Sequence, residues 1–144
     1  MSETAERGTK NWALVEAAIR ARESALAPYS GFRVGAALEA EDGTIYTGCN
    51  VESATYGQTI CAERVAVWKA LSEDARKFTG VAVVADTENL TPPCGVCRQV
   101  LWEFCGDVPV TLANLRGDFE VIQMSDLFPR PFDARFLKQT DPRR

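Results

Sequence analysis

Three cysteines and one glutamate form the pattern in this sequence with the clearest chemistry. Cys61 is followed two residues later by Glu63, and Cys94 and Cys97 form a C-x-x-C pair, each group at the start of a helical pattern. Cys94 and Cys97 can reach one ion from a single helical turn, and Cys61 would supply a third thiolate. Because catalytic zinc sites keep a fourth position open for water, the pattern predicts a three-cysteine catalytic site holding one Zn²⁺ per chain.

Glu63 is the residue that we expect to move protons at this site. Residues i and i+2 point to different sides of a helix, so Glu63 cannot easily bind the same ion as Cys61. An acid held beside a metal ion, but not bound to it, can take a proton from water and pass it to a substrate. Glu63 is therefore predicted to be catalytic.

The charge of such a site predicts a role for a nearby arginine. Three thiolates outweigh the charge of Zn²⁺, and Arg64 lies three positions after Cys61 on the same helical face. Arg98 follows Cys97 directly. We expect Arg64, with Arg98 as a second candidate, to donate hydrogen bonds to the sulfurs. The alternative is that both arginines are solvated charges on helix surfaces.

The rest of the cysteine and histidine usage limits the possibilities. The chain has no histidine, which removes the commonest zinc ligand and the commonest general base. A closed structural zinc site would need Cys49 or Cys105 as a fourth ligand. Cys105 lies about 12 Å along the predicted helix from Cys97 by the helical rise, and Cys49 lies in a predicted strand. Both are predicted to be small buried hydrophobic residues.

Length and charge exclude several classes of protein. A chain of 144 residues fits one domain, residues 1–144, able to bury its own core. The net charge of -4 offers no basic surface for nucleic acid. No apolar run approaches the roughly 20 residues needed to cross a bilayer. The polar N-terminus lacks the apolar core of a signal peptide, so we expect a cytoplasmic protein with no membrane partner.

Predicted helices and strands alternate along the chain, and these elements must position the cysteines and Glu63. A continuous β-branched run at 81–85 predicts a central strand covered on both faces, and the turn at 114–118 is too short for a parallel crossover. The expected fold is α/β, a three-layer α/β/α sandwich with one mixed five-stranded sheet. The predicted elements are a polar tail at 1–9, a helix at 11–26, a hairpin of strands 33–40 and 45–50, a helix at 61–72 with Val65, Trp68 and Leu71 among its buried positions, the strand at 81–85, a helix at 94–104, antiparallel strands at 108–113 and 119–123, and an irregular tail at 133–144.

The two half-motifs together resemble a known family. Cys61-Ala62-Glu63 and Pro93-Cys94-Gly95-Val96-Cys97 resemble the H-x-E and P-C-x-x-C signature of zinc deaminases, with cysteine as the first ligand. The resemblance spans roughly residues 12 to 132 and is close to the small, three-cysteine cytidine deaminase family. It implies zinc-dependent hydrolysis of cytidine, and of deoxycytidine, to uridine or deoxyuridine and ammonia, as in pyrimidine salvage.

The resemblance also implies a set of substrate-binding residues. Phe32 matches the aromatic residue that the family places against the pyrimidine, and Asn50 and Glu52 match the pair that binds the ribose hydroxyls. We expect the backbone around Ala62 to orient the base. From the residues alone, Asn50 and Glu52 could equally be a turn asparagine and a surface acid, and Phe32 a core residue.

Three further positions match residues that the family lends to a neighbouring subunit. These are Ala54, Tyr56 and Phe132. Family members of this length are typically homotetramers, so the resemblance implies a homotetramer with shared pockets. The loop at 86–92 cannot be mapped onto the family residue by residue.

Other functions remain open at this point. A deaminase for another small aminopyrimidine, such as a cytosine-containing antibiotic, would keep the metal motif and depart from the Asn-x-Glu sugar contact, which is intact here. A deaminase acting on polynucleotides would want a basic groove. A non-catalytic zinc scaffold would have no need for Glu63.

Overall fold

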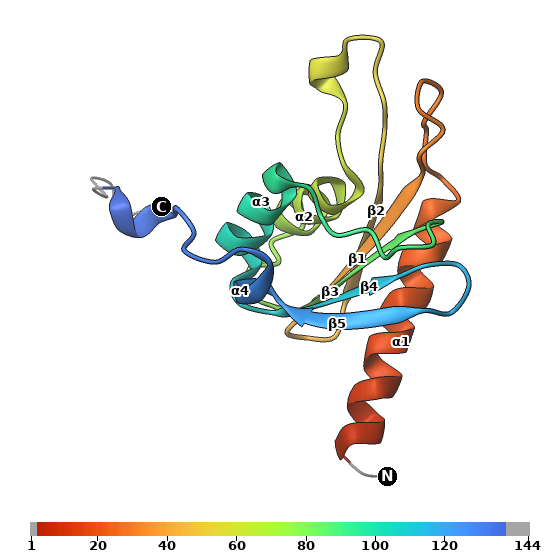
Figure 1. The fold of residues 1–144 in the computed structure, drawn as a ribbon. Helices are drawn as coiled ribbons and strands as arrows, with labels where there is room; N and C mark the ends of the chain where they lie inside the picture. The colour runs from red at the N-terminus through yellow and green to blue at the C-terminus, as the bar shows by residue number, and fades with distance from the viewer. Residues whose placement is uncertain (1–2, 138–144) are drawn as a thin grey trace.

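One mixed sheet of five strands forms the centre of the molecule (Figure 1). The computed structural model describes residues 3–137. The strand order is β2-β1-β3-β4-β5; β3 and β4 are parallel and every other neighbouring pair is antiparallel. The strands are β1 (Val34–Ala40), β2 (Ile45–Cys49), β3 (Phe78–Ala85), β4 (Pro109–Ala113) and β5 (Phe119–Gln123). The predicted mixed sheet, the central position of the 81–85 run and the antiparallel β4–β5 pair are confirmed.

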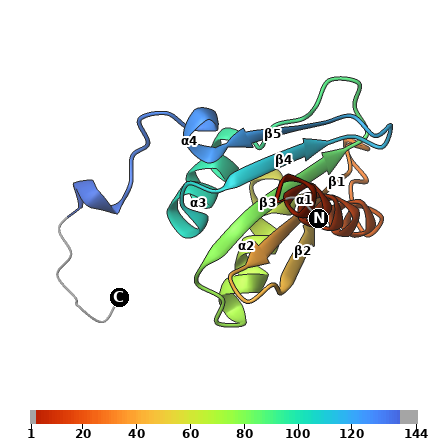
Figure 2. The same ribbon diagram turned by 90° about the horizontal axis from the view of Figure 1, so that it is seen from below.

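Helices cover both faces of this sheet, as Figures 1 and 2 show. Helix α1 (Glu3–Arg22) packs its apolar side against one face, where Leu14, Val15 and Ala18 meet alanine and valine side chains of the strands. Helices α2 (Ala62–Ser72) and α3 (Gly95–Cys105) enclose the larger apolar core on the other face. The three-layer prediction is therefore confirmed. Short helical segments complete the chain: η1 (Tyr56–Gln58), α4 (Met124–Leu127) and η2 (Ala134–Phe136).

Helix α2 lies unusually close to the sheet at Gly48 of β2. A Cβ atom added at Gly48 would lie 2.5 Å from the backbone nitrogen of Ala66, and closer still to the carbonyl oxygen of Ala62. Such an approach requires small side chains on both elements. The residues that start α2 are therefore held directly against the strand.

This close approach corrects the predicted buried face of α2. The helix buries Ala66, Val67 and Ala70, whereas Trp68 is 41% exposed and packs its ring edge-on against Phe104 of α3, 5.7 Å away. Periodicity favours large apolar residues as the buried ones. The alanines face the sheet because larger side chains would hold the helix away from Gly48.

The predicted ends of the chain also need correction. Helix α1 begins at Glu3, so the prediction of a polar tail is wrong for residues 3–9, and it ends at Arg22 instead of Leu26. The helix therefore extends over a stretch of sequence that has no apolar periodicity. The predicted irregular tail contains the short turn η2, started by Asp133, whose carboxylate accepts from the Arg135 N–H. Residues 138–144 lie outside the described part of the chain.

Membrane insertion of a helix is not supported by the fold. Within residues 3–137, no helix combines the length and the apolar character that a bilayer crossing requires.

Candidate active site

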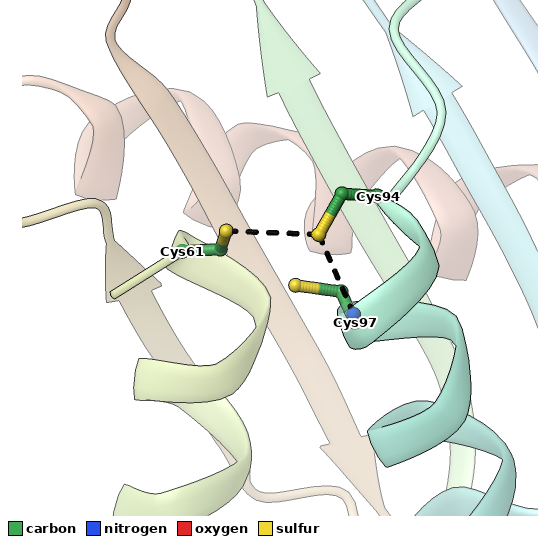
Figure 3. A group of neighbouring side chains, drawn as sticks. All are labelled: Cys61, Cys94 and Cys97. Carbon is green, nitrogen blue, oxygen red and sulfur yellow. Dashed lines mark hydrogen bonds between the residues drawn. The ribbon is translucent and has the colours of Figure 1, made fainter. Parts of the chain in front are cut away.

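Three cysteine sulfurs converge where helices α2 and α3 begin. Cys61 is the residue that precedes α2, Cys94 precedes α3, and Cys97 lies in the first turn of α3. Figure 3 shows the three side chains pointing toward one another from the two helix starts. The Sγ atoms of Cys61 and Cys94 are 3.8 Å apart, and all three sulfurs lie within 4.8 Å of one another. The two half-motifs of the sequence thus form one cluster.

The donor set fits a zinc ion. Thiolates that bind one Zn²⁺ tetrahedrally at about 2.3 Å are separated from one another by roughly 3.8 Å, which is the separation of the Cys61 and Cys94 sulfurs. The backbone N–H of Cys97 also points at Cys94 Sγ, 3.5 Å away, as expected at a helix start where N–H groups are free to stabilise a thiolate. The cluster fits one zinc ion per chain.

Arg64 lies against this cluster, as the sequence predicts. Its Nη2 atom donates to Cys61 Sγ over 3.6 Å. The pKa of Cys61 is lowered by a hydrogen bond from the Cys97 thiol and by the nearby Arg64 guanidinium. The same hydrogen bond to Cys61 raises the pKa of Cys97. Contact with the sulfurs in turn raises the pKa of Arg64. Arg64 therefore places a positive charge beside the negatively charged thiolates of the cluster.

Arg98 has a different role from the one predicted for it. Its Nε atom donates to the carbonyl oxygen of Pro93 over 2.8 Å, and Nη1 donates to that of Leu127 over 2.7 Å. Consecutive residues of a helix point in different directions, so Arg98 faces the chain on either side of α3 and not the sulfurs. It ties the segment before Cys94 to the end of α4.

Glu63 is buried beside the sulfur cluster. Its side chain is only 4% exposed, yet it lines a pocket of about 250 Å³ that opens next to Cys61 and Cys94. Burial raises the pKa of Glu63 to about 7, and the negative charge of Cys61 acts in the same direction. A carboxyl group of this kind can both accept and release a proton near neutral pH.

The same pocket contains most of the residues that the resemblance assigns to substrate. Phe32, Asn50, Glu52 and Ala62 line it together with Glu63. Phe32 is 44% exposed, so its ring belongs to the pocket wall and not to the core. A larger, open hollow of about 510 Å³ lies elsewhere, between Glu41 and Arg76, and contains none of the predicted site residues.

Asn50 holds the backbone on both sides of Arg33. Its Oδ1 accepts from the N–H of Val34 over 2.8 Å, and its Nδ2 donates to the carbonyl of Phe32 over 2.7 Å. One N–H and one lone pair of the amide remain for other partners. Asn50 therefore fixes Phe32 and still presents polar atoms to the pocket.

Glu52 is held by the turn that precedes Phe32. Its Oε1 accepts from the backbone N–H groups of Tyr29 and Ser30, over 2.9 and 3.0 Å, and its Oε2 accepts from the Ser30 hydroxyl. The hydroxyl and then the backbone N–H of Ser30 are the main causes that lower the pKa of Glu52 below its ordinary value of 4.5. Glu52 is thus a fixed carboxylate.

Ala54, Tyr56 and Phe132 lie outside the pocket. Ala54 and Tyr56 belong to the loop between β2 and α2, which projects from the body in Figure 1; Tyr56 is 76% exposed. Phe132 is 58% exposed on the segment after α4, where its ring stacks on Phe136 with centroids 5.6 Å apart. These three residues are not brought to the site of their own chain.

Sequence reasoning missed several residues that shape the pocket. Thr91 and Pro92 form part of its wall, so the loop at 86–92 is a pocket element. Buried Asn114 donates to the carbonyl of Thr87 over 3.1 Å, and the hydroxyls of Thr87 and Thr91 lie 2.9 Å apart. The position of Thr91 just before the P-C-x-x-C motif was the available signal. Ser30 was missed because its turn looks like a simple helix end.

Comparisons with known proteins agree with this geometry. The sequence model of the cytidine and deoxycytidylate deaminase zinc-binding region matches residues 9–112. A cytidine deaminase of Sporosarcina psychrophila is 55% identical over 125 residues, covering 86% of this chain and 92% of the relative. A cytidine deaminase of Halalkalibacterium halodurans is 52% identical, covering 84% of this chain and 92% of that protein.

A solved structure agrees as well. The crystal structure of a cytidine deaminase from Burkholderia pseudomallei superimposes with a TM-score of 0.82 and 48% identity, covering 84% of this chain and 98% of that one. The chain belongs to the cytidine and deoxycytidylate deaminase family.

Proposed function

We propose that this protein is a zinc-dependent enzyme that hydrolyses the amino group of cytidine, and of deoxycytidine, to give uridine or deoxyuridine and ammonia. The observation that carries the proposal is the placement of buried Glu63 beside three converging sulfurs, in a pocket with an aromatic ring and a fixed carboxylate. Family membership and the activities named for close relatives support the same reaction. Its place would be the recovery of pyrimidine nucleosides.

The chain's own residues have distinct roles in this reaction. Cys61, Cys94 and Cys97 would hold one Zn²⁺, and Arg64 would offset the excess charge of the thiolates. A zinc ion bound there would lower the pKa of the attacking water.

Glu63 carries the protons. It accepts one from the attacking water and delivers it to ring N3, which makes C4 more electrophilic. As the C4–N4 bond breaks, it transfers the remaining water proton to the leaving amino group, which departs as ammonia.

Recognition of the nucleoside follows from groups that remain free in the pocket. The Phe32 ring lies against the pyrimidine, and the backbone at Ala62 orients it. Three donors occupy three of the roughly four acceptor positions of the Glu52 carboxylate, so Glu52 can accept one sugar hydroxyl at Oε2. Asn50 contributes its unused N–H or lone pair to the same sugar.

The charge of the pocket favours nucleosides over nucleotides. Among the described residues that line it, none is lysine or arginine, whereas two are glutamates. Phosphate groups are normally bound by basic side chains or helix starts, and the helix starts here face the sulfur cluster. The same argument, with a net charge of -4, disfavours a polynucleotide substrate.

A homotetramer with shared pockets is the assembly that we propose. Two observations support this proposal: Tyr56 and Phe132 are exposed, and neither they nor Ala54 line the pocket of their own chain. Sedimentation equilibrium would give four times the mass of the chain; a monomer with full activity would contradict the shared pocket. The cytoplasmic location stays a prediction.

The experiment that tests the function compares substrates in one spectrophotometric assay. Cytidine and deoxycytidine should be deaminated, free cytosine much more slowly because the sugar contacts are missing, and deoxycytidylate poorly because of the acidic pocket. Cytosine-containing antibiotics serve as the alternative substrate class. Absence of ammonia release from both cytidine and deoxycytidine would contradict the proposal.

A further inference from the structure

The Ser30 hydroxyl joins two parts of the pocket that the proposed function treats separately. Its Oγ accepts from the backbone N–H of Phe32 over 3.0 Å and donates to Oε2 of Glu52. The backbone N–H of Ser30 donates to the other oxygen of the same carboxylate. One residue therefore connects the aromatic wall to the sugar-binding carboxylate.

The contact on Oε2 matters because Oε2 is the oxygen with a free acceptor position. Oε1 already accepts two backbone N–H groups, which fix its place. The torsion of the carboxylate plane about the Cγ–Cδ bond is then set by what Oε2 bonds to, and a terminal torsion of this kind is otherwise broad. The hydroxyl of Ser30 is the group that fills this role.

The surroundings of Ser30 argue against a role limited to folding. The residue is exposed, lines the pocket and adds nothing to either apolar core. Its two hydroxyl contacts both lead to pocket residues. Loss of this hydroxyl would leave the packing of the sheet and helices unchanged.

We propose that Ser30 is a positioning residue for the sugar of the substrate: its hydroxyl aims the free acceptor position of Glu52 at one sugar hydroxyl. The inference rests on the proposed sugar contact of Glu52. Such a contact is made in the ground state and in the transition state alike, so its loss raises KM and leaves kcat unchanged.

The test compares Ser30→Ala with a matched control, Ser53→Ala. The Ser53 hydroxyl also accepts a backbone N–H two residues on, from Thr55 over 3.1 Å, but it does not line the pocket. Each zinc-loaded variant is assayed with cytidine and with 2′,3′-dideoxycytidine, which lacks the 2′- and 3′-hydroxyls and keeps the 5′-hydroxyl. The ratio of the two kcat/KM values does not depend on the fraction of folded enzyme.

We expect only Ser30→Ala to lose the preference for cytidine over dideoxycytidine, measured as the ratio of the two kcat/KM values. Ser30→Ala should lower kcat/KM for cytidine about tenfold, the range of one hydrogen bond to a charged group, mainly through KM. The value for dideoxycytidine should stay within about twofold, well inside the effect of one hydrogen bond. Ser53→Ala should behave as the unmodified protein, and Ser30→Thr, which restores a hydroxyl, should recover most of the preference.

Other outcomes would overturn the proposal, and they separate it from the proposed function. An equal loss on both nucleosides would mean that Ser30 acts through the fold or through Phe32 and not through Glu52. A further loss of preference when Ser30→Ala is added to Glu52→Ala would mean that Ser30 does not act through Glu52. If Glu52→Ala itself kept the full preference for cytidine, the sugar contact would be wrong and the inference with it. Absence of deamination by the unmodified protein would instead contradict the function.

Discussion

The sulfur cluster end of the pocket adjoins the core, where Cys97 and Glu63 are buried although Cys94 is exposed, whereas Ser30 at the sugar end is exposed. Glu63 is buried at the start of α2 and Cys97 at the start of α3, and α2 is held against β2 at Gly48. At the sugar end, Glu52 and Ser30 sit in loops and are fixed by hydrogen bonds to backbone groups. The first end is positioned by packing and the second by a local hydrogen-bond network.

Because one end is positioned by packing and the other by hydrogen bonds, the two ends of the pocket should respond differently to substitutions. A packed site loses its geometry when a neighbouring backbone moves, because interiors have little spare space. A hydrogen-bonded loop responds to the loss of single polar groups and leaves the core unaffected. We expect the chemistry to depend on the sulfur cluster end and the affinity for nucleosides to depend on the sugar end.

The largest effect is expected at Glu63. Glu63→Gln keeps the size of the side chain and removes the proton carrier, so turnover should fall by about 10² to 10⁴-fold, the range for general acid–base catalysis. Zinc content, measured by atomic absorption, and KM for cytidine should change little because the sulfurs and the sugar end are intact. A variant with near-normal kcat would show that the proton moves through another group.

A smaller effect is expected at Arg64. Arg64→Gln removes the positive charge near the Cys61 sulfur while keeping a polar side chain. Because partners of metal ligands commonly contribute 10–100-fold, zinc affinity or turnover should fall by about that factor. Competition with a chromophoric chelator measures the affinity. Arg98→Gln is the comparison variant, since Arg98 bonds to Pro93 and Leu127 carbonyls; an equal loss of affinity there would contradict the assignment.

The close approach at Gly48 predicts a loss of stability that is transmitted to the site. Gly48→Ala forces α2 away from β2, which should lower the free energy of unfolding by about 1–3 kcal/mol, as for other overpacked cores. Since Ala62 lies between Cys61 and Glu63, turnover should fall too. Gly80→Ala is the control because its new Cβ would be 3.6 Å from Leu14 Cδ2, an ordinary contact. Urea denaturation of the three proteins measures the difference, and equal stabilities would contradict it.

The smallest effect is expected when pH acts on the sugar end. Ser30 holds the pKa of Glu52 below 4.5, so the Glu52 carboxylate is charged at every pH above 4.5. The charge, and the sugar contact that depends on it, is lost only when the pH falls through this lowered pKa. The ratio of KM for cytidine to KM for dideoxycytidine should therefore stay constant from about pH 8 down to about pH 4.5, the ordinary pKa of a glutamate, because titration of Glu63 affects both nucleosides alike. A ratio that has risen about twofold by about pH 4.5 would mean that Glu52 is half protonated there and titrates normally.

Much of the fold and all of the sulfur cluster could be predicted from the sequence. Alternation of helical and strand patterns gives the sheet, and the two cysteine motifs with Glu63 carry their own spacing rules. The start of α1 and the exposure of Trp68 could not be predicted, because the first depends on local helix propensity without apolar periodicity and the second on the approach of α2 to Gly48.

The sugar end was the less predictable part for a related reason. Its geometry depends on contacts between residues far apart in the chain, such as Ser30 with Glu52 and Asn50 with Phe32. No spacing rule links these pairs. From the residues alone, Phe32 looked like a core residue, and only the family resemblance indicated a pocket role for it. Arg98 was misjudged because adjacency to Cys97 in sequence is not adjacency in space.

The central claim, that zinc held by the three cysteines is required for cytidine deamination, is tested most directly by metal removal and return. The purified protein is stripped with a chelator, reloaded with increasing Zn²⁺ and assayed with cytidine, with bound metal measured at each step. Activity should be absent without metal and rise in proportion to zinc, reaching its maximum at about one ion per chain, by the ligand count. Full deamination of cytidine by the metal-free protein would contradict the account.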